Sequence, residues 1–83
     1  MRELTVYSRS GCHLCELLIE DLAPMCESAG VRLNILDVDG QQSWKDRYGL
    51  RVPVVCDGEN EISAWPLDEG RVRRWLGARR PAG

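Results

Sequence analysis

The chain has 83 residues, enough for one small domain with a single core but too few for a large enzyme with a deep cleft of its own. Hydrophobic residues make up 43% and charged residues 29%, a balance typical of a folded protein, and the net charge of −2 argues against a nucleic-acid binder. No apolar run is long enough to span a membrane and no apolar leader follows Met1, so we expect a cytoplasmic protein without a membrane partner.

The first predicted elements are a strand over residues 3–7 and a helix over residues 12–29. Apolar residues recur at helical spacing along one stripe of this helix, and they are Leu14, Leu18, Leu22, Met25 and Ala29. Pro24 lies inside the pattern, so we expect it to kink the helix or to end it early. Gly30 is expected to stop the helix.

The second half of the chain predicts short strands and helices in alternation. A strand, a short helix and two further strands are expected over residues 31–38, 42–48, 53–56 and 61–65. Asp57-Gly58 between the last two strands is a strong signal for a tight hairpin. Asp68 is expected to cap a last helix at its N-terminus.

The predicted order is therefore β-α-β-α-β-β-α. The first β-α-β unit is long enough for a right-handed crossover between parallel strands, and the last two strands form an antiparallel pair. This order predicts an α/β fold, a four-stranded mixed sheet with helices on both faces. We expect one domain over residues 1–79 and a short tail over residues 80–83.

Cys12 and Cys15 form a Cys-x-x-Cys pair at the predicted junction of the first strand and the first helix. Free backbone N–H groups and the helix dipole favour negative charge there, so we expect them to lower the pKa of the Cys12 thiol. A thiolate is the nucleophile of thiol–disulfide exchange, and Cys15 is close enough to attack a mixed disulfide formed at Cys12. The placement predicts a reversible redox pair, whereas Cys26 and Cys56 are expected to be buried as small hydrophobic residues.

Two other interpretations of the pair stay open. A Cys-x-x-Cys pair is also half of a zinc site, but no second close pair follows, and Cys26 should lie about three helical turns beyond Cys15. A metal cluster shared between two subunits is a variant of this interpretation. The other is a non-catalytic binding domain, which a Cys12 pKa near that of free cysteine would favour.

The chain resembles glutaredoxins, and more widely the thioredoxin-fold oxidoreductases, in residues 7–15 (YSRSGCHLC), in Val52-Pro53 and in Asp68 before the last helix. The resemblance covers essentially the whole chain, because the element order also matches the compact glutaredoxin form. It implies a thioredoxin-like fold of the glutaredoxin type and a cis peptide bond before Pro53. The bare backbone edge beside that proline would then pair with a substrate's main chain or with glutathione.

The resemblance also implies a glutathione site. Arg9 matches the family's basic residue that contacts the glycyl carboxylate of glutathione, and Asp68 matches the acidic residue that contacts its γ-glutamyl amine. Gly11 lets the backbone approach a partner closely, and Arg9 and His13 can add positive potential near Cys12. The sequence departs from the family's Pro-Tyr between the cysteines and from its glycine pair before the last helix, with His13-Leu14 and Trp65-Pro66-Leu67 in their places.

Together these features predict a thiol–disulfide oxidoreductase in which Cys12 attacks, Cys15 resolves, and Val52 and Pro53 orient the substrate backbone. The expected substrates are disulfide-containing proteins or glutathione mixed disulfides. No bound organic cofactor or metal is expected, and glutathione would act as a diffusing co-substrate. The electron donor would be glutathione or a reductase, and nothing in the sequence requires more than a monomer.

Overall fold

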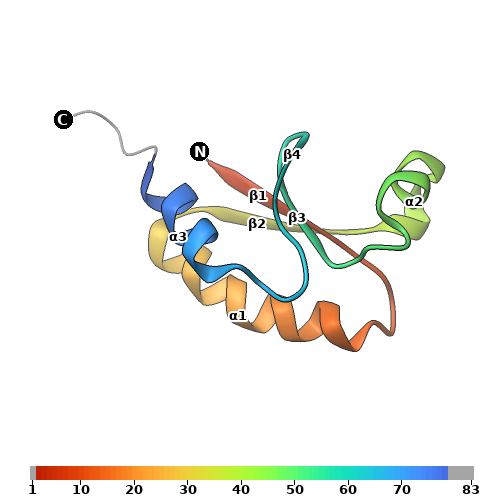
Figure 1. Cartoon of the computed structure of the whole chain (residues 1–83), viewed down its shortest axis with the longest axis horizontal. Coiled ribbons are helices and arrows are strands. Elements are labelled where there is room, and N and C mark those ends of the chain that lie inside the picture. The colour runs from red at the N-terminus through yellow and green to blue at the C-terminus, as the bar shows by residue number, and fades with distance from the viewer. Residues whose placement is uncertain (1, 79–83) are drawn as a thin grey trace.

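The computed structural model describes residues 2–78, and its elements follow the predicted order β-α-β-α-β-β-α, with a 3₁₀ turn added after the second strand. The elements are β1 (Glu3–Ser8), α1 (His13–Ala29), β2 (Arg32–Asp37), η1 (Val38–Gly40), α2 (Gln42–Tyr48), β3 (Val54–Asp57), β4 (Asn60–Ser63) and α3 (Glu69–Ala78). Figure 1 shows them in colour order along the chain. The tail expected over residues 80–83 lies outside the described residues.

The four strands form one mixed sheet in the order β2-β1-β3-β4. β1 and β2 are parallel and are joined by the α1 crossover, whereas β3 runs antiparallel to both β1 and β4. The carboxyl ends of β1 and β2 therefore lie at the same end of the sheet. The segments that follow these two strands begin there, and one of them carries Cys12.

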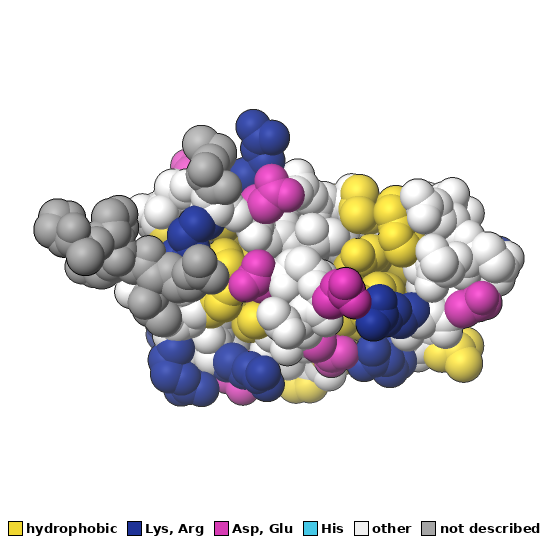
Figure 2. Space-filling model, turned by 90° about the horizontal axis from the view of Figure 1, so that it is seen from above, with side chains coloured by type: hydrophobic (Ala, Val, Ile, Leu, Met, Phe, Trp, Pro, Cys, Tyr) yellow, Lys and Arg dark blue, Asp and Glu magenta, His cyan; other side chains and the backbone are white. Residues whose placement is uncertain are grey.

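Alternation along β1 and β3 builds a core on each face of the sheet. On one face, α1 and α3 pack against Leu4, Val6 and Val55. On the other face, α2 packs Tyr48 against Val54 and Cys56. Helices cover both faces, as predicted, and Figure 2 looks onto the α2 face, where hydrophobic side chains gather toward the α2 end.

The buried stripe of α1 differs from the predicted one. Its buried residues are Cys15, Leu18, Leu22 and Cys26, a spacing that follows one helical face. Leu14 is 41% exposed and Ala29 is exposed. At the start of the helix the buried residue is therefore Cys15 rather than Leu14, and at the end of the helix Ala29 does not belong to the buried stripe. The predicted stripe counted only Leu, Met and Ala and left Cys15 out of the core, whereas the separate expectation that Cys26 is buried is confirmed.

Pro24 does not end α1, which continues to Ala29. Burial of Cys26 holds the last turn against the core, and Gly30 then closes the helix in the left-handed conformation with φ of 70°. The N–H of Val31 donates to the carbonyl of Cys26 over 2.9 Å, which satisfies one of the free carbonyls at the helix end. The predicted glycine stop is confirmed, and of the two effects expected of Pro24, a kink or an early end, the early end is wrong.

The β3–β4 hairpin turns one residue later than predicted. Asp57 pairs with Asn60, so the two loop residues are Gly58 and Glu59, and Gly58 takes the positive φ that such a tight turn needs. Beyond the hairpin, Asp68 caps α3 and Val72 is buried beneath it. No helix within residues 2–78 is long and apolar enough to cross a membrane.

Candidate active site

The cysteine pair begins α1, directly after a tight turn that leaves β1. The N–H of Cys12 donates to the carbonyl of Arg9 over 3.2 Å, and Gly11 has a φ of 75° inside that turn. A four-residue turn with a positive φ at its third position favours glycine there, which explains Gly11. The Cα atoms of Cys12 and Cys15 lie 5.2 Å apart, and their sulfur atoms are paired as a disulfide.

Cys12 occupies the N-cap position of α1. Its Sγ accepts the backbone N–H of Cys15 over 3.2 Å, and its carbonyl accepts the N–H of Glu16 over 3.1 Å. In the reduced protein, the same N–H and the positive end of the helix dipole would stabilise a thiolate at Cys12. The sequence pattern predicted this placement, and the structure brings both cysteines to it.

The two cysteines differ in exposure. Cys12 is half-buried, whereas Cys15 is 1% exposed and begins the buried stripe of α1. Cys12 is therefore the more accessible of the two cysteines to a disulfide partner from solution. This asymmetry suits a division of roles in which Cys12 attacks first and Cys15 attacks afterwards.

Val52 and Pro53 lie just before β3, beside the end of β1. Val54 pairs with Tyr7, the residue before the last of β1, so Pro53 comes next to the point where the Cys12 turn departs. Pro53 is buried, Val52 is half-buried, and the peptide bond between them is cis. The fold thus brings Val52-Pro53 and the cysteine pair to the same end of the sheet.

Of the other residues predicted near Cys12, two are exposed and one is bound to neighbouring loops. Gly11 and His13 are both exposed on the segment that presents Cys12. The Arg9 guanidinium turns toward the protein, where it forms an ion pair with Asp39 over 3.1 Å and donates to the carbonyl of Gly49 over 3.1 Å. Sequence reasoning missed this use of Asp39 and Gly49, because a contact between three loops leaves no local pattern.

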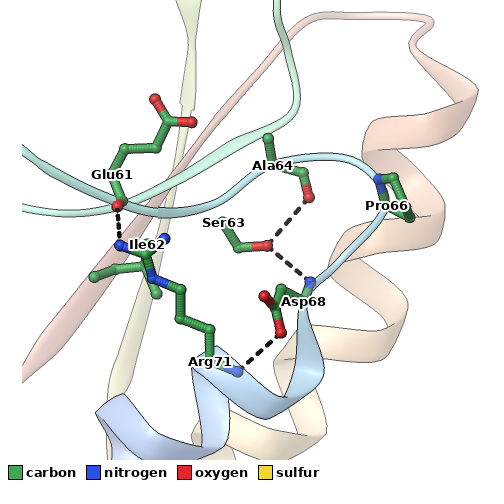
Figure 3. Close-up of a pocket in the computed structure, with 7 residues that line it drawn as sticks. All are labelled: Glu61, Ile62, Ser63, Ala64, Pro66, Asp68 and Arg71. Carbon is green, nitrogen blue, oxygen red and sulfur yellow. Dashed lines mark hydrogen bonds between the residues drawn. The ribbon is translucent and has the colours of Figure 1, made fainter.

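Asp68 lies at the start of α3, where its Oδ1 accepts the N–H of Arg71 over 3.0 Å. Its own N–H donates to Ser63 Oγ over 2.9 Å. Figure 3 shows both bonds at the wall of an open cavity of about 380 Å³, which is lined by Glu61, Ile62, Ser63, Ala64, Pro66, Asp68 and Arg71. None of the residues that line this cavity belongs to the Cys12 turn. Trp65, next to Pro66 in the sequence, is 39% exposed.

The other two cysteines lie in the two cores and do not join the pair. Cys26 is buried on α1, and burial raises the pKa of its thiol. Cys56 is buried on the opposite face of the sheet, where its Sγ lies 3.8 Å from the Tyr48 hydroxyl and burial again raises its pKa. Both behave as small core residues, and residues 2–78 contain no group of three or more His, Cys, Asp or Glu side chains arranged to hold a metal ion.

Comparison with solved structures supports the fold independently. A protein from Nitrosomonas europaea, solved in solution, superposes with a TM-score of 0.80 at 32% identity, covering 92% of each chain. A crystal structure of a protein from X. campestris gives a TM-score of 0.69 at 37% identity, covering 93% of this chain and 99% of that one. Thioredoxin 1 from Thermosipho africanus gives a TM-score of 0.63 at 16% identity over 92% of this chain and 96% of its own, a likeness of fold alone.

Sequence comparison identifies the family. An uncharacterized protein of Mycobacterium tuberculosis is 32% identical over 76 residues, covering 86% of this chain and 78% of that protein, and its counterpart in Mycobacterium bovis matches equally. The model of the glutaredoxin-like domain (DUF836) matches residues 3–77, nearly the whole chain. The chain, with its thioredoxin-like fold and its cysteine pair at the start of α1, therefore belongs to the glutaredoxin-like family.

Proposed function

We propose that this protein is a thiol–disulfide oxidoreductase, with Cys12 as the nucleophile and Cys15 as the resolving thiol. The observation that carries the proposal is the N-cap position of Cys12. Cys12 is half-buried and its sulfur accepts the Cys15 N–H over 3.2 Å, whereas Cys15 itself is buried. A stabilised thiolate next to a protected second thiol is the arrangement that two-step disulfide exchange needs.

In the first step, the Cys12 thiolate attacks one sulfur of the substrate disulfide. A new S–S bond forms as the old one breaks, and the expelled sulfur leaves as a thiolate that takes up a proton. Cys15 then loses its proton to solvent and attacks the Cys12 sulfur, which releases the second substrate sulfur as a thiol. The substrate gains two electrons from the Cys12–Cys15 pair and two protons from solvent, which replace the proton that Cys12 lost when it formed the thiolate and the proton that Cys15 loses in the second step.

The oxidised pair must be returned to the dithiol by a reductant of thiol chemistry, either glutathione or a dithiol-containing reductase. Disulfide-containing proteins and glutathione mixed disulfides are the substrates we propose. Val52 and Pro53, beside the end of β1, would align the backbone of such a substrate next to Cys12. No bound organic cofactor takes part in these steps.

Intact-mass spectrometry after equilibration with different ratios of reduced to oxidised glutathione tests the proposal. We expect a reversible loss of two hydrogen atoms in the native protein and no such loss in Cys12→Ser or Cys15→Ser. Cys26→Ala is the matched control, since it removes a buried thiol of the same helix and should leave the transition in place. A glutathione adduct on Cys12 in the Cys15→Ser variant would show that glutathione itself reaches the site.

A native protein that stays reduced at every ratio would overturn the proposal. The cysteine pair would then be an inactive feature of a binding domain with the same fold. Loss of the transition in Cys26→Ala, with Cys12→Ser unaffected, would instead place the redox chemistry at a different thiol. Both outcomes are read from the same mass spectra.

A further inference from the structure

Arg9 joins three separate segments at the active-site end of the sheet. Its Nε and Nη2 donate to the two carboxylate oxygens of Asp39 in η1, over 3.1 and 3.2 Å. Its Nη1 donates to the carbonyl of Gly49, which follows α2, over 3.1 Å. Its own carbonyl accepts the N–H of Cys12 over 3.2 Å, so one residue connects η1, the Cys12 turn and the segment that leads to Pro53.

The Arg9–Asp39 contact has the geometry that orients a side chain. Two parallel N–H···O bonds between a guanidinium and a carboxylate fix both planes as well as the distance. Asp39 is itself held in place, since its N–H donates to Asp37 Oδ1 over 2.8 Å and the Lys45 ammonium lies 3.9 Å from its Oδ1. Because Arg9 and Asp39 are both partly exposed, with side chains 36% and 46% accessible, the ion pair adds little to stability.

At Gly49, the segment that leads from α2 to Pro53 lies close to the Arg9 guanidinium. A Cβ added at Gly49 would lie 2.5 Å from the Lys45 carbonyl oxygen and 3.3 Å from Arg9 Nη2. Only a residue without a side chain fits between the end of α2 and the Arg9 guanidinium. The chain then continues from Gly49 to Val52-Pro53, so the position of Arg9 bears on where that segment begins.

From these contacts we infer that Asp39 is a positioning residue for disulfide exchange. By holding the Arg9 side chain, Asp39 sets the spacing between the turn that presents Cys12 and the segment that presents Val52-Pro53. A substrate disulfide must lie in that space with its sulfur in line with the Cys12 sulfur. The inference rests on the proposed function and assigns to Asp39 a role in orienting the bound substrate rather than in activating the thiolate.

The test measures kcat/KM for reduction of insulin disulfides, with dithiothreitol as the reductant, in Asp39→Ala, Arg9→Ala and the double variant. We expect Asp39→Ala to lower kcat/KM on the order of tenfold, since small misplacements of reacting groups carry penalties of that size or greater. If Asp39 acts through Arg9, adding Asp39→Ala to Arg9→Ala should cause no further loss. The pH dependence of Cys12 alkylation by iodoacetamide should be the same in Asp39→Ala as in the native protein.

Glu69→Ala is the control, because it removes another ion pair with an arginine, the more exposed one to Arg73 on α3, and should leave kcat/KM unchanged. An active native protein with full kcat/KM in Asp39→Ala would overturn this inference alone, and so would additive losses in the double variant. A shift in the pH dependence of Cys12 alkylation in Asp39→Ala would also overturn the inference, because it would show that Asp39 acts on Cys12 electrostatically rather than by positioning the substrate. A native protein with no Cys12-dependent turnover would overturn both this inference and the proposed function.

Discussion

The backbone N–H of Cys15 donates to Cys12 Sγ over 3.2 Å, so Cys15 contacts the sulfur that we propose as the nucleophile through its main chain. The contact depends on the helical conformation of the residues between them and not on the Cys15 thiol. Replacing that thiol should therefore leave the N–H donor in place. The N–H donor of Cys15 and its proposed role as the resolving thiol are therefore separable by mutation.

We predict that the Cys12 thiol of Cys15→Ser has a pKa below that of free cysteine. The Cys15 N–H and the α1 dipole both favour the thiolate, and the substitution keeps both. The measurement is the rate of alkylation by iodoacetamide against pH, compared with the same variant unfolded in urea, which abolishes the helix. Alkylation profiles that coincide in the folded and unfolded protein would contradict the prediction.

The elements and the cysteine site were largely predictable, because their signals are local. The predicted α2 bounds agree with the structure, and Gly30, Asp68 and the Cys-x-x-Cys pair act through neighbouring residues. The Arg9–Asp39–Gly49 contacts were not predictable, since they join segments far apart in the chain. The predicted helix end at residue 29 agrees with the structure, and the early end that Pro24 suggested does not occur, because burial of Cys26 and the cap at Gly30 outweigh the helix-breaking tendency of proline.

The corrected stripe of α1 predicts different consequences for two leucines of the same helix. Leu18 is fully buried in the core between the sheet, α1 and α3, so Leu18→Ala should lower the free energy of unfolding by about 2–5 kcal/mol. Leu14 is 41% exposed, so Leu14→Ala should cost well under about 1 kcal/mol. Urea unfolding of the oxidised protein, followed by tryptophan fluorescence, measures both values. Similar losses of unfolding free energy in the two variants would indicate that Leu14 belongs to the buried stripe of α1 after all.

Stability should fall as the pH rises into the alkaline range. Burial, with a smaller contribution from the contact with Cys56, raises the pKa of Tyr48 from 10.0 to about 12, and burial raises the pKa of Cys26 above its usual 9.0. Each group is neutral when folded and ionises at lower pH when unfolded. Their contribution is therefore complete below the unfolded pKa and is lost as the pH approaches the folded pKa.

Urea unfolding of the oxidised protein between about pH 8 and about pH 11 measures this loss. Tyr48→Phe removes the ionising hydroxyl but keeps the ring that stacks on Tyr7, so its stability should depend less steeply on pH above about pH 10. Burial also raises the pKa values of Cys26, Cys56 and Tyr7, which still titrate in that variant, so part of the slope should remain. Equal slopes in Tyr48→Phe and the native protein would show that the hydroxyl does not contribute.

Asp68 has two separable roles, a structural one seen at α3 and a proposed one toward glutathione. Its Oδ1 caps the helix by accepting the Arg71 N–H over 3.0 Å, so Asp68→Ala should lower the free energy of unfolding by about 1 kcal/mol. Asp68→Asn keeps an oxygen acceptor and should retain most of that stability while losing the charge. If the carboxylate also contacts the γ-glutamyl amine, Asp68→Asn should raise KM for a glutathione mixed disulfide without changing KM for insulin disulfides. Equal KM values for both substrates in Asp68→Asn and the native protein would leave Asp68 with its capping role alone.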